Sequence, residues 1–128
     1  PDLAESEAHV EALAARGELT PKMLARFLRE GRRTRLIAAL ARLAEIDFHT
    51  ARQILDGRRV DPLAIACKAA GLDRALFLTF GVLMREADDT ALGHAGAYGH
   101  LYGQLSGGAA CRAARVWRLG RRAAAAAA

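Results

Sequence analysis

The amino-acid sequence predicts an all-α fold, a right-handed stack of antiparallel helix pairs with about seven to eight helices. Three observations predict it. Alanine and leucine dominate the 128 residues, aromatic residues make up only 5% and prolines number 3, a composition that favours helix almost throughout. No stretch alternates apolar and polar residues as a half-buried strand does. The middle of the chain repeats a helix-pair unit of 26 residues.

The first expected helix spans residues 2–16, and Gly17 ends it. Its amino-terminal half is rich in glutamate, which favours that end of a helix dipole. Its apolar face is expected to carry Leu3, Val10 and Leu13 inward.

Capping and breaking residues mark the helices that follow. The hydroxyl of Thr20 is expected to cap a helix that Pro21 opens and Gly31 ends. Thr34 is expected to cap the third helix in the same way. Carboxylates are expected to open the fourth, fifth and sixth helices, at Asp47, Asp61 and Asp73.

The C-terminal third has a different character. Glycines punctuate residues 93–103, so a helix there is expected to depend on tertiary contacts. Ser106 is expected to cap a last helix that turns alanines and Trp117 inward. Arginines on the outer face of this helix form a candidate basic C-terminal helix, made of Arg112, Arg115, Arg118, Arg121 and Arg122.

The repeat becomes visible when residues 22–47 are laid over residues 48–73. Each unit contains a helix, a Gly-Arg-Arg turn, a second helix and an aspartate that caps the next unit. One helix pair cannot bury its apolar face alone, so such units are expected to stack. The coinciding residues include Gly31/Gly57, Arg32/Arg58, Arg33/Arg59 and Asp47/Asp73.

Stacking in parallel would bring the two Gly-Arg-Arg turns to one edge. We call this candidate interaction surface the arginine edge; it consists of Arg32, Arg33, Arg35, Arg58 and Arg59. Guanidinium groups bind carboxylates and phosphates through paired hydrogen bonds, so the edge could receive an acidic peptide, a phosphoryl group or a nucleic-acid backbone. The alternative is that these arginines only keep the turns soluble.

The net charge of +5 and the pI near 10.0 also suggest an anionic partner. Almost all of the positive charge is arginine, since Lys22 and Lys68 are the only lysines. Arginine enrichment beside abundant alanine also arises in GC-rich genomes, so the net charge alone does not establish a nucleic-acid partner.

No set of residues has the spacing that a known chemistry requires. The four histidines are scattered, and none shares an i, i+3 or i, i+4 spacing with another histidine, cysteine or carboxylate set that resembles a known metal site. No glycine-rich phosphate loop joins a strand to a helix, and no serine or cysteine has a base implied by spacing. We therefore expect no catalytic residue, no cofactor and no metal site, and a protein that is not an enzyme.

Residues 40–55 resemble the helix-turn-helix of bacterial repressors. The early alanine, the hydrophobic residue after the turn and the closing Ile54 and Leu55 fit that motif. Glu45 stands where the motif usually has glycine, and Ala51 replaces the usual isoleucine or valine. A corner of a helical repeat produces the same apolar pattern.

Residues 1–122 are expected to form a single helical-repeat domain of a longer protein, followed by a poly-alanine tail at residues 123–128. Cys67 and Cys111 lie among alanines and are expected to be buried free thiols, which fits a reducing cytoplasm. No apolar run is long enough to span a membrane.

Several runs together carry a family resemblance. They are residues 10–31, Ala38 to Ala44, Ala66 to Leu72 and Ala114 to Leu119. With them the chain, from about Val10 to Arg122, resembles the uncharacterised bacterial family called domain of unknown function 2336. The resemblance implies an all-helical domain, similar to HEAT repeats, from a longer cytoplasmic protein with no assigned activity. The glycines of residues 93–103 are not part of the family pattern.

These observations predict a helical-repeat scaffold that presents one face or edge to a protein partner, with nucleic acid as a less favoured partner. The first alternative is a helix-turn-helix domain that binds DNA and regulates transcription. The second is a helical signalling domain that handles phosphoryl groups.

Overall fold

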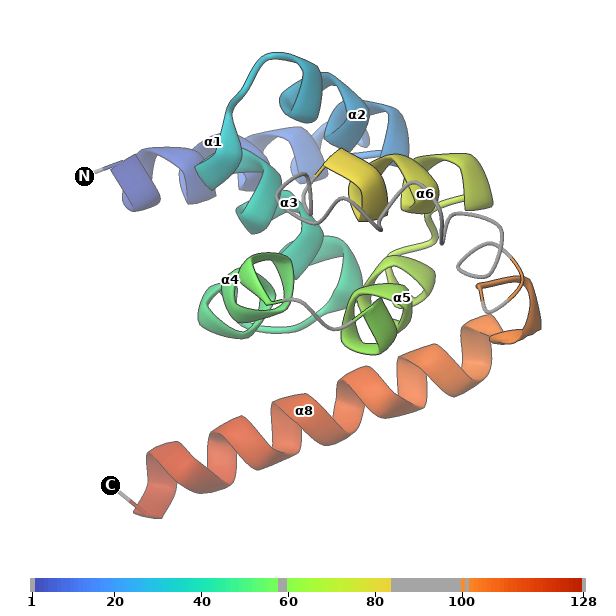
Figure 1. The fold of residues 1–128 in the computed structure, drawn as a ribbon. Coiled ribbons are helices and arrows are strands. Elements are labelled where there is room, and N and C mark those ends of the chain that lie inside the picture. Colours follow the sequence, from blue (N-terminus) through green and yellow to red (C-terminus); the bar gives the residue numbers. More distant parts are fainter. Residues whose placement is uncertain (1, 58–59, 84–99, 101, 128) are drawn as a thin grey trace.

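The computed structural model of the protein describes residues 2–57, 60–83, 100 and 102–127. Within these residues the regular structure is entirely helical, so the all-α prediction is confirmed (Figure 1). The helices are α1 (Asp2–Ala15), α2 (Pro21–Arg29), α3 (Arg33–Ala44), α4 (Phe48–Asp56), α5 (Val60–Ala69), α6 (Arg74–Leu83) and α8 (Gly107–Ala127).

Helix α3 lies at the centre of the fold. It packs against α1, α2, α4 and α5, whereas α6 and α8 both pack on α5. All residues of α3 from Leu36 to Ala41 are buried, and so is Ala44. The alanines among them have small side chains, so neighbouring helices can approach α3 on several sides at once. The hydrophobic core is therefore continuous from α1 to α6.

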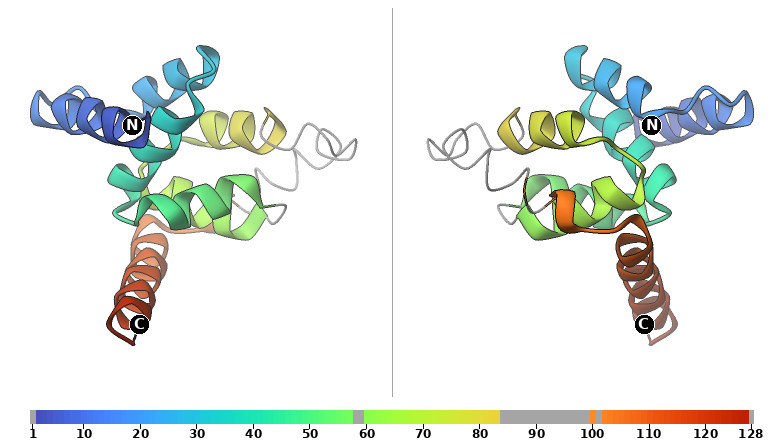
Figure 2. Two further views of the ribbon diagram at one scale, coloured as in Figure 1. Left: turned by 90° about the vertical axis from the view of Figure 1, so that its left-hand side faces the viewer. Right: turned by 90° about the vertical axis from the view of Figure 1, so that its right-hand side faces the viewer.

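Helix α8 lies at one side of the molecule (Figures 1 and 2). It has 21 residues and α5 has 10, so at about 1.5 Å per residue α8 is roughly twice as long as the helix it packs on. Ala110 and Ala114 are buried against the core. Cys111 is exposed, contrary to prediction, because a helix covered mainly by one neighbour buries only a narrow face. Cys67 on α5 is fully buried, as predicted.

Three of the predicted helix caps are confirmed. Asp47 Oδ1 accepts a hydrogen bond from the Thr50 N–H at 2.8 Å, and Asp73 Oδ1 accepts one from the Leu76 N–H at 2.8 Å. Ser106 Oγ accepts one from the Ala109 N–H at 3.0 Å. Each bond satisfies an N–H group that has no partner within its own helix.

Two predicted helix starts are wrong in detail, and one predicted capping bond is not formed. Helix α2 begins at Pro21 as predicted, with Thr20 in the cap position, but the Thr20 side chain makes no capping hydrogen bond. Helix α3 begins at Arg33, one residue before Thr34, because the N–H of Arg32 bonds to the carbonyl of Phe27 and the chain turns at once into the helix. Helix α5 begins at Val60, so Asp61 lies within its first turn.

The ends of α3 and α5 show the repeat in structural detail. Glu45 and Gly71, 26 positions apart in the aligned units, both adopt the left-handed conformation, with φ of 59° and 83°. The hydrogen bond from the Ile46 N–H to the Ala41 carbonyl recurs as one from Leu72 to Cys67, both at 3.0 Å. The two units therefore close their second helices in the same way.

The Gly-Arg-Arg turns differ from each other. Gly31 adopts a positive φ of 69°, whereas Gly57 is extended with φ of −74° and ψ of 165°. A Cβ atom at Gly57 would lie 3.0 Å from the carbonyl oxygen of Gln53, so close backbone approach favours glycine there. Glycine is therefore favoured at Gly31 by its positive φ and at Gly57 by the close approach of the backbone.

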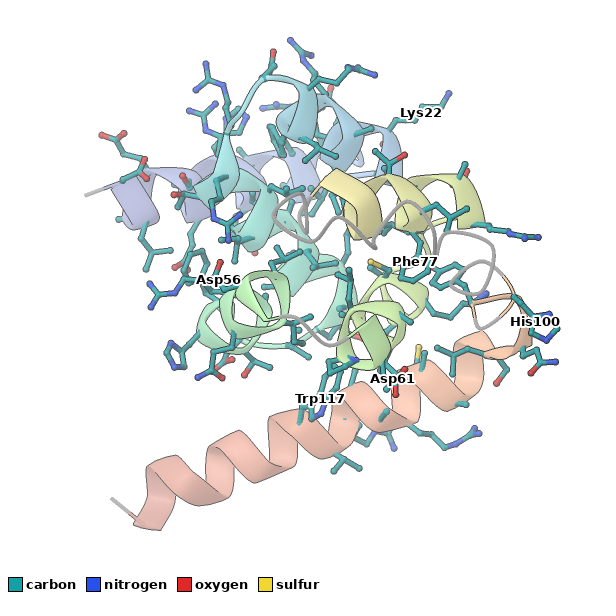
Figure 3. The ribbon with its side chains drawn as sticks, in the orientation of Figure 1. Lys22, Asp56, Asp61, Phe77, His100 and Trp117 are labelled. Atoms are coloured by element: carbon teal, nitrogen blue, oxygen red, sulfur yellow. The ribbon has the colours of Figure 1, made fainter. Side chains whose placement is uncertain are left out.

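Tyr102 fixes the chain that precedes α8 to the helical core. Its ring stacks on Phe77, with centroids 4.3 Å apart and planes at 8°, and the Nζ atom of Lys68 lies 4.1 Å from its centroid. Its hydroxyl donates a 2.6 Å hydrogen bond to the Leu72 carbonyl. Phe77 lies between α6 and α5 (Figure 3). Tyr102 therefore joins residues from three parts of the fold; residues 93–99 of the predicted glycine-rich helix lie outside the described residues.

Leu3 is a second residue that was predicted to be buried and is exposed. It lies in the first turn of α1 and is 40% exposed, while Val10 and Leu13 further along the same helix are buried as predicted.

Candidate functional site

The described residues of the arginine edge lie at the start of α3. Arg32 occupies the position before the helix and makes no side-chain cap, and Arg33 is the first helical residue. The guanidinium of Arg33 pairs with the carboxylate of Asp56, which lies at the end of α4 (Figure 3). This contact shows that the first Gly-Arg-Arg turn lies beside the segment that leads into the second turn. Arg58 and Arg59 of the second turn lie outside the described residues.

Each turn also carries a carboxylate that the sequence reasoning overlooked. Glu30 and Asp56 directly precede the two glycines and are equivalent in the aligned units. Glu30 lies 3.4 Å from Arg26 Nε and 3.7 Å from Arg32 Nε, and Asp56 pairs with Arg33. These side chains are about half exposed, and exposed ion pairs contribute only about 0–1 kcal/mol each. A partner's carboxylate can therefore replace them at small cost.

Arg35 differs from the other two arginines. It lies one turn further along α3 and is partly buried, and it takes part in no ion pair among the described residues. Because a partly buried guanidinium has lost some of its hydration, this side chain has a stronger requirement for an anion than an exposed arginine has.

A histidine from α1 lies beside these arginines. The ring of His9 is 6.0 Å from the ring of Phe27 on α2. Burial, followed by the positive charges of Arg35, Arg16 and Arg32, lowers the pKa of His9 below its usual value of 6.5. The sequence did not single out His9 from the other three histidines. Its neighbours come from α2 and α3, and no sequence spacing relates them to His9.

A groove of about 340 Å³ lies between α1, α3 and the start of α4. Its apolar lining includes Val10, Ile46 and Phe48, and the ion pair of Glu11 and Arg42, at 2.9 Å, lies along it. The carboxylates of Glu7, Glu11 and Asp47 make its polar lining mainly acidic.

The segment that resembles a helix-turn-helix forms α3, a three-residue turn and α4. Glu45 adopts the left-handed conformation that glycine would adopt at this position of the motif, so the unusual residue does not prevent the turn. A positive φ also occurs at Gly17, Gly31 and Gly71, after α1, α2 and α5, so this conformation is a common helix ending in this protein. His49, Arg52 and Gln53 are exposed on α4.

The candidate basic C-terminal helix corresponds to α8. Arg112 and Arg115 are exposed on it, and Arg118, Arg121 and Arg122 lie further along the same helix. Trp117 is partly buried and packs against the core, and Figure 3 shows it between α8 and the rest of the molecule. The described arginines of α8 and those at the start of α3 belong to different helices that do not pack closely on each other.

Two features are absent from the described residues. No group of three or more histidine, cysteine or acidic side chains is arranged to hold a metal ion. None of the helices in this part of the chain combines the length and apolar character needed to cross a membrane.

Comparison with known families gives a match over residues 2–115, to the family described as "Uncharacterised protein conserved in bacteria (DUF2336)". The chain belongs to this family. The matched range includes α1 to α6 and the first part of α8, so the arginine edge and His9 lie within the DUF2336 domain, as do Arg112 and Arg115. No curated protein and no solved structure shows significant similarity to the chain. The match over residues 2–115 confirms the family resemblance that was predicted from the sequence.

Proposed function

We propose that this DUF2336 domain is a non-enzymatic, cytoplasmic helical-repeat module, a right-handed HEAT-like stack of antiparallel helix pairs, that binds a protein partner through the arginine edge. Helical-repeat domains commonly bind other proteins, because their stacked units form an extended surface.

The equivalence of the two units carries this proposal. Their second helices close with the same backbone conformation and hydrogen bond, and the same aspartate cap begins the next helix. The ion pair of Arg33 and Asp56 then ties the first turn to the second unit. The guanidinium groups of Arg32 and Arg33 at the first turn suit a partner segment that carries carboxylates.

The helix-turn-helix alternative has one observation in its favour, which is the left-handed turn at Glu45. Two observations weigh against it. The same turn recurs at Gly71, where no recognition helix is expected. The groove at the start of α4 is lined by Glu7, Asp47 and the ion pair of Glu11 and Arg42, so its net charge is negative and would repel a DNA phosphate. We therefore favour a protein partner.

Affinity capture with charge-reversed variants tests the proposal. Wild-type protein, Arg32→Glu/Arg33→Glu and a control, Arg74→Glu, are used to capture proteins from lysate of the source bacterium. Arg74 is exposed at the start of α6, away from the edge. We expect one protein to be retained by the wild type and the control and lost with the edge variant, and then to bind directly when purified.

Two results would overturn the proposal. One is a set of captured proteins that edge reversal leaves unchanged. The other is retention of duplex DNA at low salt, with an affinity that falls steeply as salt is added, which would favour the helix-turn-helix alternative.

A further inference from the structure

His9 lies on α1, whereas Arg32 directly precedes α3 and Arg35 lies in its first turn. Helices α1 and α2 both pack on α3. The His9 ring lies 6.0 Å from the Phe27 ring, and the carbonyl of Phe27 accepts a 3.0 Å hydrogen bond from the Arg32 N–H. Arg32 directly precedes α3, with φ of −88° and ψ of 74°, and Arg35 follows it by three positions in the first turn of the helix. Phe27 thus lies between the histidine and the beginning of the arginine run.

The charged groups that lower the His9 pKa are Arg35 and Arg32 at the start of α3 and Arg16, which directly follows α1. Helix α2 contributes the uncharged ring of Phe27, and Glu5 lies one turn before His9 on α1. Arg16 is paired with Glu18 at 3.2 Å, and Arg32 is only loosely paired with Glu30 at 3.7 Å. Arg35 is partly buried with no ion pair among the described residues. The cluster therefore has an excess of positive charge next to a ring that can donate a further hydrogen bond.

We propose that His9, Arg35 and Arg32 form a recognition site for one oxyanion on an acidic segment of the protein partner. Arg35 binds the oxyanion through two parallel N–H donors, Arg32 exchanges Glu30 for the new anion, and His9 donates a hydrogen bond from its ring. A carboxylate and a phosphorylated side chain can each offer two oxygens to the paired donors of a guanidinium. The inference rests on the proposed function, because it assigns the oxyanion to the protein that the arginine edge binds.

The site makes binding pH-dependent in a defined direction. A bound anion favours the protonated imidazole, so His9 takes up a proton when the oxyanion binds. Affinity is therefore expected to increase as the pH falls through the titration range of His9. The three arginines keep their charge throughout this range.

Calorimetric titration of the whole protein tests the site. The probes are a short peptide rich in aspartate and glutamate, the same peptide carrying one phosphoserine, and inorganic phosphate. Arg35→Ala is expected to lower the affinity for the tighter peptide about tenfold or more, since a charged hydrogen bond contributes about 1.5–3 kcal/mol. The control Arg74→Ala is expected to bind like the wild type. The tighter peptide identifies the oxyanion as carboxylate or phosphate.

The histidine is tested separately. In His9→Gln the increase in affinity between pH 8 and pH 6 is expected to disappear, while binding at pH 8 is retained. Circular dichroism checks that each variant is folded. Arg35→Lys serves as a second variant, because it keeps the charge and loses the paired donors.

Several results would overturn the inference: no probe binds the wild type, Arg35→Ala and Arg74→Ala bind alike, the pH dependence survives in His9→Gln, or duplex DNA binds more tightly than either peptide. Failure here is distinguishable from failure of the proposed function. If edge reversal at Arg32 and Arg33 releases the captured protein and Arg35→Ala does not, the function stands without this site. If phosphate binds through Arg35 and no protein is captured, the site stands without that function.

Discussion

Tyr102 provides the most quantitative test of how the C-terminal part of the fold is held. The substitution Tyr102→Phe removes one hydroxyl and keeps the ring, which is 1% exposed and stacked on Phe77. The lost bond is the 2.6 Å hydrogen bond to the Leu72 carbonyl. Removing the donor leaves a carbonyl without this partner in a buried setting. We expect the free energy of unfolding to fall by about 1–2 kcal/mol.

Truncation of the ring should cost more. Tyr102→Ala also removes the stacking on Phe77 and the contact with the Lys68 ammonium. Replacing a buried aromatic ring by alanine costs about 3–5 kcal/mol, which is a large part of the total stability of a typical domain. This variant is expected to be partly unfolded at room temperature, with faster hydrogen exchange in α8.

Urea unfolding followed by circular dichroism measures both effects. The matched control is Thr79→Val, which removes a hydroxyl that donates a 2.9 Å hydrogen bond to the Ala75 carbonyl on an exposed surface. The control is expected to change stability by less than about 0.5 kcal/mol. If Tyr102→Phe changes stability no more than Thr79→Val does, the role assigned to the Tyr102 hydroxyl is wrong.

The same hydroxyl predicts an alkaline instability. Burial, with smaller effects of Cys67 and Asp73, raises the pKa of Tyr102 above its usual value of 10.0. The unfolded chain loses this proton first, so the stabilisation is complete below about pH 10 and is lost as the pH rises above it. Tyr102→Phe should lack this part of the pH dependence. Equal alkaline profiles for the two proteins would contradict the prediction.

Three further predictions concern the helix ends and His9. Glu45→Gly should raise the free energy of unfolding by about 1 kcal/mol, since glycine adopts the left-handed conformation without strain; a lower value would argue against φ of 59° there. Asp47→Ala and Asp73→Ala should each lower it by about 1 kcal/mol, and clearly unequal losses would argue against equivalent units. The lowered pKa of His9 predicts that stability falls as the pH decreases through about 6.5, and that His9→Gln lacks this loss; urea unfolding at a series of pH values measures both.

Local features of the fold could be predicted from the sequence. Asp47, Asp73 and Ser106 were correctly identified as caps, because a cap bonds to an N–H group only a few positions along the chain. The repeat could also be recognised from the sequence, because the residues that it repeats are the ones that begin and end each helix. Cys111 was misplaced because the number of neighbours around α8 is set by tertiary packing.

The candidate site could be predicted only in part. The sequence alignment placed Arg32 and Arg33 at an equivalent turn, and the same alignment pairs Glu30 with Asp56, a signal that was available and overlooked. The position of His9 beside Arg35 was not predictable, because it depends on how α1 packs on α3.

The most direct test of the arginine edge as a protein-binding surface is site-specific photo-crosslinking in living cells. A photoreactive residue replaces Arg32 at the edge, Ala75 on α6 or Gln53 on α4, all of which are exposed. We predict one defined protein crosslinked from position 32 and absent from position 75. Equal protein crosslinking from positions 32 and 75, or crosslinks to DNA from position 53, would contradict the account.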